Sequence, residues 1–260
     1  MGANSEPEDQ VLLSAVLIVK NESDKLAECL ESLYFADEIL VLDSGSTDDT
    51  CDIAHRYGAR VAVELEWQGF GVQRQRAQSL ARGHWILCID ADERVTVPLR
   101  QSIVQAINGD DAVYEVNRLS WCFGRFMRHT DMYPDWIPRL YPRAKAGFDD
   151  TRVHERLQNP QKLPVRRLDG DLLHYVYDSV RHLVSKSALY SEQWAIARAE
   201  QGRKGSLLSA CLHGLACFVR MYVLRRGFLD GGQGFLIALV MSHATFVKYA
   251  DLWVRTRTAP

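Results

Sequence analysis

The sequence predicts an α/β fold in which a mostly parallel central sheet carries helices on both faces and a helical appendage follows it. Three observations lead to this prediction. Apolar runs suited to buried strands alternate with helical periodicity over roughly the first hundred residues. Each of these runs ends abruptly in polar residues. Beyond Ser179 the pattern is helical to the end of the chain.

The first strand is predicted over Val11–Val19, a continuous apolar run rich in β-branched residues. Leu26 and Leu30 recur at helical spacing behind it, which predicts a helix. Asn21 or Ser23 would cap the start of that helix, because a short polar side chain there can accept a hydrogen bond from a free backbone N–H group.

The second strand is predicted over Ile39–Leu42 and ends in the polar loop 43–50. Ser46 and Asp49 have the spacing of a capping box at the start of a second helix, and Gly58 would close that helix. A third strand over 61–65 and a helix over 74–82 then lead to a fourth strand that begins near Trp85.

The fourth strand ends in the acidic run Asp90-Ala91-Asp92. Side chains alternate faces along an extended strand, so Asp90 and Asp92 are predicted to project the same way. Two carboxylates in one small space are stabilised by a proton or by a divalent cation with open positions for phosphate oxygens. The alternative is that one of them caps the next helix, with Glu93 in its first turn.

Three polar clusters follow predicted strands: Lys20-Asn21-Glu22, Asp43, and Asp90-Ala91-Asp92. The carboxyl ends of parallel strands meet at one edge of the sheet, where α/β sheets bind ligands. No G-x-G-x-x-G follows the first strand and no phosphate-binding P-loop motif occurs, which disfavours a dinucleotide cofactor and excludes a P-loop. An acidic edge can hold a nucleotide diphosphate through a bridging cation, so the pattern indicates a metal-dependent enzyme that uses a nucleotide.

The segment 119–141 is aromatic and basic, and its three prolines argue against a helix. Aromatic rings with interspersed donors suit sugar binding, and a packed cover over the sheet has the same composition. The segments 151–156 and 172–175 each place charged residues around single apolar positions, which is typical of a strand at a sheet edge.

The composition is that of a globular protein, with 47% hydrophobic and 25% charged residues among 260. The formal net charge of -2 gives no basic field, so nucleic acid is not an expected partner. Six cysteines without a C-x-x-C pair indicate buried, reduced thiols in a cytosolic compartment. Residues 1–10 are polar, lack the layout of a secretory signal, and are expected to form a disordered tail.

The predicted domains are therefore a catalytic domain over 11–178 and a helical region over 179–260. Two apolar stretches in the latter, 207–224 and 235–253, approach the length of a membrane span. Polar interruptions such as Arg220 and Lys248 argue against a full span. Their basic residues fit a segment that lies on the cytoplasmic membrane surface. The alternative is a helical bundle packed on the catalytic domain or on another subunit.

Three motifs together resemble the family 2 inverting glycosyltransferases: Val19-Lys20-Asn21-Glu22, the run from Ile39 to Asp48, and Ile89-Asp90-Ala91-Asp92-Glu93. That resemblance implies a GT-A nucleotide-sugar-binding fold with an Asp-x-Asp metal site. Later motifs, including the run from Trp136 to Leu140 and that from Val153 to Leu157, resemble the lipopolysaccharide inner-core glucosyltransferases. These add β-1,4-glucose to the first heptose.

The resemblance implies a set of partners and residue roles. The donor is a UDP-sugar, with UDP-glucose expected, and the acceptor is a glycolipid such as the inner-core heptose. Asp43 reads the uracil or ribose, and Lys20 and Glu22 line the nucleoside pocket together with Asn21, Ser44 and Ala91. Asp90 and Asp92 hold Mn²⁺ or Mg²⁺ beneath the diphosphate. Lys20 stands where many members carry an aromatic residue, and Ser44 where many carry a second Asp.

Further roles follow from the chemistry of direct displacement at an anomeric carbon. Glu155, which matches the family's His-Glu motif, is the expected base for the acceptor hydroxyl. His174 is a plausible additional metal ligand, and Arg74 or Arg139 would pair with phosphate oxygens. For each of these groups, the alternative is an ordinary surface ion pair.

Other reactions and roles remain open at this level. A polyprenyl phosphate is another possible acceptor for the same chemistry. A sugar-nucleotide pyrophosphorylase shares the sheet and the acidic site, but it would carry a glycine- and arginine-rich loop after its first strand. A non-catalytic membrane-associated binding module would have no need of paired aspartates.

Overall fold

The computed structural model describes residues 11–151 and 155–257, which form two compact units. One unit comprises Met1–Arg118 with Asp135–His174, and the other comprises Leu119–Pro134 with Tyr175–Pro260. The aromatic segment 119–134 therefore belongs with the C-terminal helices. The predicted boundary between two domains at residue 178 therefore differs from the division between the two units, which falls after His174 and also assigns 119–134 to the second unit. The expected N-terminal tail over residues 1–10 lies outside the described residues.

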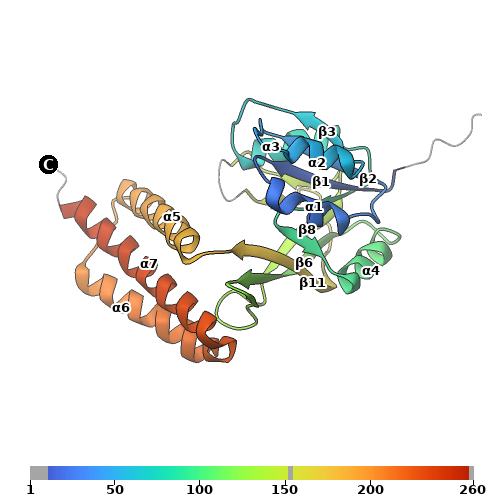
Figure 1. Ribbon diagram of the computed structural model, residues 1–260. Helices are drawn as coiled ribbons and strands as arrows, with labels where there is room; N and C mark the ends of the chain where they lie inside the picture. The colour runs from blue at the N-terminus through green and yellow to red at the C-terminus, as the bar shows by residue number, and fades with distance from the viewer. Residues whose placement is uncertain (1–10, 152–154, 258–260) are drawn as a thin grey trace, which may run out of the picture. The chain divides into compact units, whose positions relative to one another are not determined.

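The central sheet has the strand order β3-β2-β1-β4-β8-β6-β11-β5, and β7 pairs with β6 (Figure 1). β1, β2, β3 and β4 pair in parallel, whereas β4–β8, β6–β8, β6–β7 and β5–β11 are antiparallel. A separate pair is formed by β9 and β10. The bounds are β1 Leu13–Val19, β2 Glu38–Asp43, β3 Arg60–Val63, β4 Trp85–Cys88, β5 Glu93–Val95, β6 Val113–Cys122, β7 Arg125–Phe126, β8 Trp136–Pro142, β9 Gly147–Phe148, β10 Leu157–Gln158 and β11 Val165–Tyr177.

Helices cover both faces of the parallel strands, as the sequence predicts. One buried cluster joins α1 (Ser23–Glu31), α2 (Thr50–Arg56) and α4 (Val97–Ala106) to one side of the sheet. The other cluster joins α3 (Phe70–Leu80) to the opposite side. Because β1 is buried on both faces, its continuous apolar sequence is explained by the core on each side of it.

The predicted helix caps are wrong in detail. The N-cap residue of α1 is Glu22, and that of α2 is Asp49; neither side chain makes a capping hydrogen bond. The Ser46 hydroxyl donates to Asp43 instead of forming a capping box. Thr96 caps α4 by accepting from the Leu99 N–H, so neither Asp90 nor Asp92 caps the next helix.

The end of β4 also differs from the prediction. The strand stops at Cys88, and Glu93 begins the short strand β5 rather than a helix. Asp90 and Asp92 therefore lie in the turn between two strands, where strand alternation no longer fixes their directions. Their neighbours in the folded chain decide which way each carboxylate points.

The second unit contains three long helices. They are α5 (Val180–Glu200), α6 (Leu207–Phe218) and α7 (Gly231–Arg257), with a π-helical segment η1 (Val219–Leu224) and a 3₁₀ turn η2 (Gly227–Asp230) between the last two. α5 and α6 both pack on α7, which runs between them (Figure 1). The stretches Leu207–Leu224 and Gly227–Arg257 are long and apolar enough to cross a membrane, by length and composition alone. In the 18-residue apolar window of each, 22% and 17% is buried.

Candidate functional site

The first part of the site is the loop that follows β2. Asp43 is 2% exposed, and its Oδ2 accepts hydrogen bonds from the N–H groups of Gly45 at 2.8 Å and Ser46 at 2.9 Å. Gly45 has φ +86°, a conformation that glycine adopts without strain. Asp43 also accepts from the Ser46 hydroxyl, and the Cys51 thiol is a further hydrogen-bonding neighbour. Burial, and then the charge of Asp43, raise the pKa of that thiol and help to keep it protonated.

The ends of β1 and β2 are tied together at this loop. The Asn21 N–H donates to the Ser46 hydroxyl at 2.8 Å, and the Asn21 side-chain oxygen accepts from the Thr47 N–H at 2.8 Å. The Ser44 hydroxyl accepts from the Gln73 side chain at 3.0 Å. Lys20 is exposed beside them. The predicted meeting of the first two polar clusters at one sheet edge is thus present.

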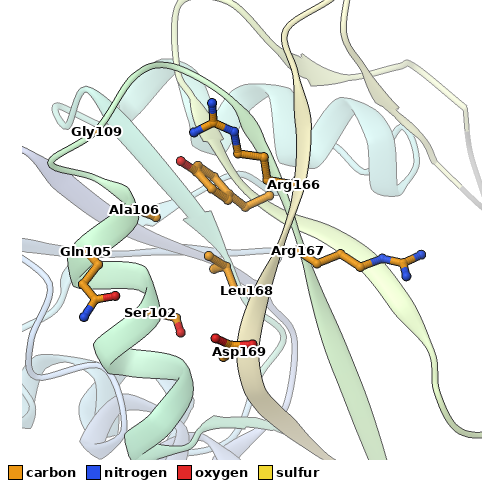
Figure 2. Close-up of a pocket in the computed structure, with 9 residues that line it drawn as sticks. Ser102, Gln105, Ala106, Gly109, Arg166, Arg167, Leu168 and Asp169 are labelled. Carbon is orange, nitrogen blue, oxygen red and sulfur yellow. The ribbon is translucent and has the colours of Figure 1, made fainter.

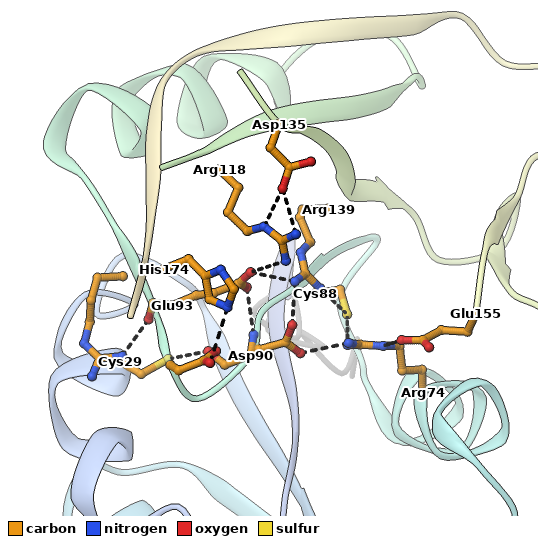
Figure 3. A network of polar contacts seen from close by, with 12 residues as sticks. Cys29, Arg74, Cys88, Asp90, Glu93, Arg118, Asp135, Arg139, Glu155 and His174 are labelled. Atoms are coloured by element: carbon orange, nitrogen blue, oxygen red, sulfur yellow. Dashed lines mark hydrogen bonds and ion pairs between the residues drawn. The ribbon is translucent and has the colours of Figure 1, made fainter. Parts of the chain in front are cut away.

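Asp90 is held by two arginines from distant parts of the chain (Figure 3). Arg74 of α3 donates to its Oδ1 at 2.8 Å, and Arg139 of β8 donates to its Oδ2 at 2.5 Å. Burial raises the pKa of Asp90, but the charges of Arg139 and Arg74 outweigh burial and hold that pKa well below its usual range. The Arg74 and Arg139 side chains are 8% and 6% exposed, so the surface-ion-pair alternative is wrong for both.

Glu93 is a buried member of this network that the sequence analysis did not assign to the site. One oxygen of Glu93 accepts from Arg139 at 2.7 Å and the other accepts from the Asp90 N–H at 3.0 Å. Arg118 lies 3.9 Å from Glu93 and pairs with Asp135 at 2.7 Å (Figure 3). Burial raises the pKa of Glu93 even against the nearby guanidinium of Arg139. The third acid in Asp90-Ala91-Asp92-Glu93 is the signal that would have pointed to it.

Asp92 points to a different partner. Its Oδ2 lies 3.3 Å from Nε2 of His174 on β11, whose side chain is 12% exposed. Burial raises the pKa of Asp92, and the hydrogen bond and charge of His174 reverse that effect and lower it. Glu22 lies near both aspartates. Its pKa is raised by burial and then by the negative charges of Asp92 and Asp90. This side of the turn is therefore rich in carboxylates.

Glu155 is brought to the same site by Arg74. The Arg74 Nε donates to the Glu155 carboxylate at 2.8 Å while its Nη2 contacts Asp90, so one guanidinium bridges the two acids (Figure 3). The third nitrogen, Nη1, lies 2.7 Å from the Cys88 sulfur. Glu155 is 13% exposed, which again excludes a surface pair. Val153 and His154 of the same motif lie outside the described residues.

The donor set fits a divalent cation only in part. Both oxygens of Asp90 are engaged by arginines, which departs from its predicted role as a metal ligand. Within residues 11–151 and 155–257, no group of three or more His, Cys, Asp or Glu side chains is arranged to hold a metal. Asp92 and His174 do lie side by side, and Mg²⁺ sites often use one or two carboxylates and take their other ligands from substrate phosphates and water. These two residues fit an ion that arrives with a nucleotide diphosphate.

A separate hollow in the same unit is lined by α4 and the start of β11 (Figure 2). Its lining includes Ser102, Gln105, Tyr114, Arg166 and Asp169. None of the predicted site residues contributes to it, so this hollow is distinct from the network around Asp90.

Parallel strands that place buried carboxylates at their carboxyl ends, extended by antiparallel strands, are the arrangement of the GT-A class of glycosyltransferases. The model of the glycosyl transferase family 2 matches residues 14–159, and the chain belongs to that family. The predicted fold class and enzyme class are therefore confirmed. Family membership favours a glycosyltransferase over the pyrophosphorylase and over the non-catalytic module.

Similar proteins extend over nearly the whole chain. An uncharacterized glycosyltransferase of Rickettsia felis is 31% identical over 258 residues, covering 92% of this chain and 89% of its own length. The lipopolysaccharide core biosynthesis glycosyltransferase LpsC of Rhizobium meliloti is 28% identical over 250 residues, with 94% and 92% covered. The crystal structure of S. aureus TarS 1-349 in complex with UDP-GlcNAc has a TM-score of 0.50 and 15% identity, covers 95% and 91%, and supports the fold alone.

Proposed function

We propose that this protein moves a sugar from a UDP-sugar to a glycolipid, with inversion at the anomeric carbon. The proposed pair is UDP-glucose and a heptose of the lipopolysaccharide inner core, joined in β-1,4 linkage. The resemblance of the sequence motifs to inner-core glucosyltransferases supports this pair, and the similarity to LpsC over 94% of the chain supports an acceptor in the lipopolysaccharide core. We propose the inner face of the cytoplasmic membrane as the place of the reaction, because a glycolipid acceptor is anchored there.

The observation that carries the proposal is the bridge made by Arg74. Glu155 is far from Asp90 in the sequence, yet one guanidinium contacts both at 2.8 Å. An inverting displacement needs a base for the acceptor hydroxyl close to the groups that hold the donor diphosphate. The bridge brings the proposed base to the edge where Asp43, Asp90 and Asp92 lie.

In the proposed reaction, Asp43 and its loop bind the uridine end of the donor. Glu155 takes the proton of the acceptor hydroxyl as the new carbon–oxygen bond forms and the bond between the anomeric carbon and UDP breaks. Arg74, which Asp90 holds in place, orients Glu155 and screens its charge. Asp92 and His174 would hold Mn²⁺ or Mg²⁺, which when bound supplies Lewis-acid stabilisation of the departing diphosphate.

The primary test measures UDP release from a panel of nucleotide sugars with Mn²⁺, with Mg²⁺ and after chelation. UDP-glucose is expected to be preferred, with release stimulated by a heptose-containing core lipid and lost on chelation. Stimulation by a polyprenyl phosphate in place of the core lipid would refute the proposed acceptor. Equal turnover after chelation would refute the role of the metal.

Glu155→Gln tests the base. Loss of a general base reduces the rate by about 10²- to 10⁴-fold, so transfer should fall by that factor while UDP binding persists. Glu66→Gln, on an exposed loop, is the matched control and should transfer normally. Normal transfer by Glu155→Gln would place the base elsewhere.

A further inference from the structure

The side of α6 that faces away from α7 is an exposed aliphatic stripe. Leu208, Leu212, Leu215, Val219 and Val223 are 71%, 58%, 63%, 39% and 52% exposed, and these five residues are called the α6 outer face below. Their spacing places them along one line of the helix and its continuation in η1. A contiguous exposed apolar surface of this kind marks an interaction site.

The opposite side of α6 is occupied by α7. Ala210, Gly214 and Cys217 are buried, and the Ser242 hydroxyl of α7 donates to the Gly214 carbonyl at 2.7 Å. A helix turns about 100° per residue, so Leu208, Leu212 and Leu215 point roughly half a turn away from this buried side. The α6 outer face is therefore directed away from the rest of the three-helix layer.

Basic residues stand at both ends of this face. The segment 201–229 contains no Asp or Glu, and its five cationic residues are all exposed: Arg203, Lys204, Arg220, Arg225 and Arg226. The first two precede α6 and the last three belong to or follow η1. Asp131 pairs with Arg220 at 2.7 Å and with Arg225 at 3.4 Å, which leaves a net positive charge at each end.

We infer that the α6 outer face docks on an anionic lipid bilayer, with α6 lying in the plane of the interface. Docking here would bring the enzyme to the membrane that holds its glycolipid acceptor. Only this purpose rests on the proposed function; the docking itself is argued from the surface. Anionic headgroups complement the cations at both ends while the aliphatic stripe enters the acyl boundary. A second copy of the chain fits less well, because pairing two such faces in either direction brings cationic ends together.

The neighbouring helices explain why α6 lies in the plane instead of spanning the bilayer. α5 packs along α7, where the Ser191 hydroxyl donates to the Ala244 carbonyl at 3.1 Å and the Trp194 and Tyr249 rings lie 4.7 Å apart. α5 carries charged residues along its length: Arg181, Lys186, Glu192, Arg198 and Glu200. A spanning hairpin of α6 and α7 would draw this helix into hydrocarbon, which charged side chains oppose. With α6 on the surface, α5 is the helix farthest from the lipid.

The test is flotation of the full chain with vesicles of phosphatidylcholine, with or without phosphatidylglycerol, in the absence of donor and acceptor. Binding is expected to rise at least tenfold with phosphatidylglycerol and to fall with salt. Leu208→Glu/Leu215→Glu should reduce binding to both vesicle types at least tenfold. Leu189→Glu, at a 53% exposed leucine of α5, is the matched control and should bind as the parent does. Unchanged binding by the double variant would overturn the inference.

Two further readouts separate the remaining outcomes. Cys211 is exposed on α6, so vesicles should protect it from a water-soluble maleimide, and alkaline carbonate should release the bound protein. Resistance to carbonate would overturn the in-plane arrangement. A dimer in solution that Leu208→Glu/Leu215→Glu converts to monomer, without vesicle binding, would assign the face to a second copy. Because flotation needs no turnover, lipid binding without UDP-glucose transfer would refute the proposed function and leave the docking surface standing.

Discussion

The loop of Asp43 and the turn of Asp90 hold their carboxylates in two different ways. Asp43 is satisfied by groups two and three residues further along the chain. Asp90 is satisfied by Arg74 and Arg139, which come from α3 and β8. A carboxylate held by its own loop keeps its partners wherever that loop forms. A carboxylate held by distant guanidiniums depends on the packing of several elements, and loss of Arg139 would also leave the buried charge of Glu93 without its partner.

The largest effect on stability is expected from Arg139→Met. This change leaves Glu93, which is 0% exposed, and Asp90 without a shared cation. Breaking a buried pair from one side costs about 3–5 kcal/mol, and the free energy of unfolding from urea titration should fall by that amount. Arg139→Met/Glu93→Gln should recover part of the loss, because it removes one of the stranded charges. A loss below about 1 kcal/mol would show that Glu93 and Asp90 do not depend on Arg139.

Glu38 extends the comparison to the opposite end of the same sheet. It accepts from the Ser14 hydroxyl at 2.5 Å and pairs with Arg60 at 2.7 Å and Arg82 at 3.0 Å. Burial raises the pKa of Glu38, but hydrogen bonds from Ser14, Arg82 and Arg60 outweigh burial and lower that pKa to about 2.

A lowered pKa stabilises the fold above the pKa of the unfolded chain, and that contribution disappears as the pH falls through the folded value. Glu38→Gln should therefore lower the free energy of unfolding by roughly 2 kcal/mol at neutral pH. The difference from the parent should shrink as the pH falls from about 4.5, the ordinary pKa of Glu, to about 2, its pKa in the folded protein. Urea unfolding at a series of pH values measures this, and a difference independent of pH would show that the charge is not responsible.

The smallest effect on stability is expected in the Asp43 loop. Gly45→Ala places a side chain at φ +86° and brings its Cβ within 2.9 Å of a Leu65 methyl carbon, at a cost of about 1–2 kcal/mol. Gly58→Ala is the matched control, because Gly58 has φ +74° with nothing within 4 Å of an added Cβ. Both substitutions should lower the free energy of unfolding, because alanine is strained at a positive φ. Only Gly45→Ala should also weaken UDP binding, as measured by calorimetry. Equal UDP affinity in the two variants would remove the Asp43 loop from the donor site.

Much of the parallel half of the fold could be predicted from the chain alone. The apolar runs of β1, β2 and β4, and the polar residues that end them, placed Lys20-Asn21-Glu22 and Asp43 at one edge before any contact was known. The Asp43 loop is local, and Gly45 is its sequence signature. The same pattern indicated a metal-dependent enzyme that uses a nucleotide. The resemblance of its motifs to family 2 implied a glycosyltransferase, and the family match over 14–159 agrees with that class.

The tertiary structure decided how the acidic run is used. The strand ends at Cys88, so the directions of Asp90 and Asp92 depend on partners far away in the sequence: two arginines for Asp90 and His174 for Asp92. No periodicity predicts that Arg74 bridges Asp90 to Glu155, or that Glu93 is buried against Arg139 and the Asp90 N–H. Likewise, the sequence marked an apolar C-terminal region, but only the packing of α7 against one side of α6 left the α6 outer face exposed. The physical reason is common to both cases. Local patterns fix where a chain turns and which residues are apolar, and long-range packing fixes what each side chain meets.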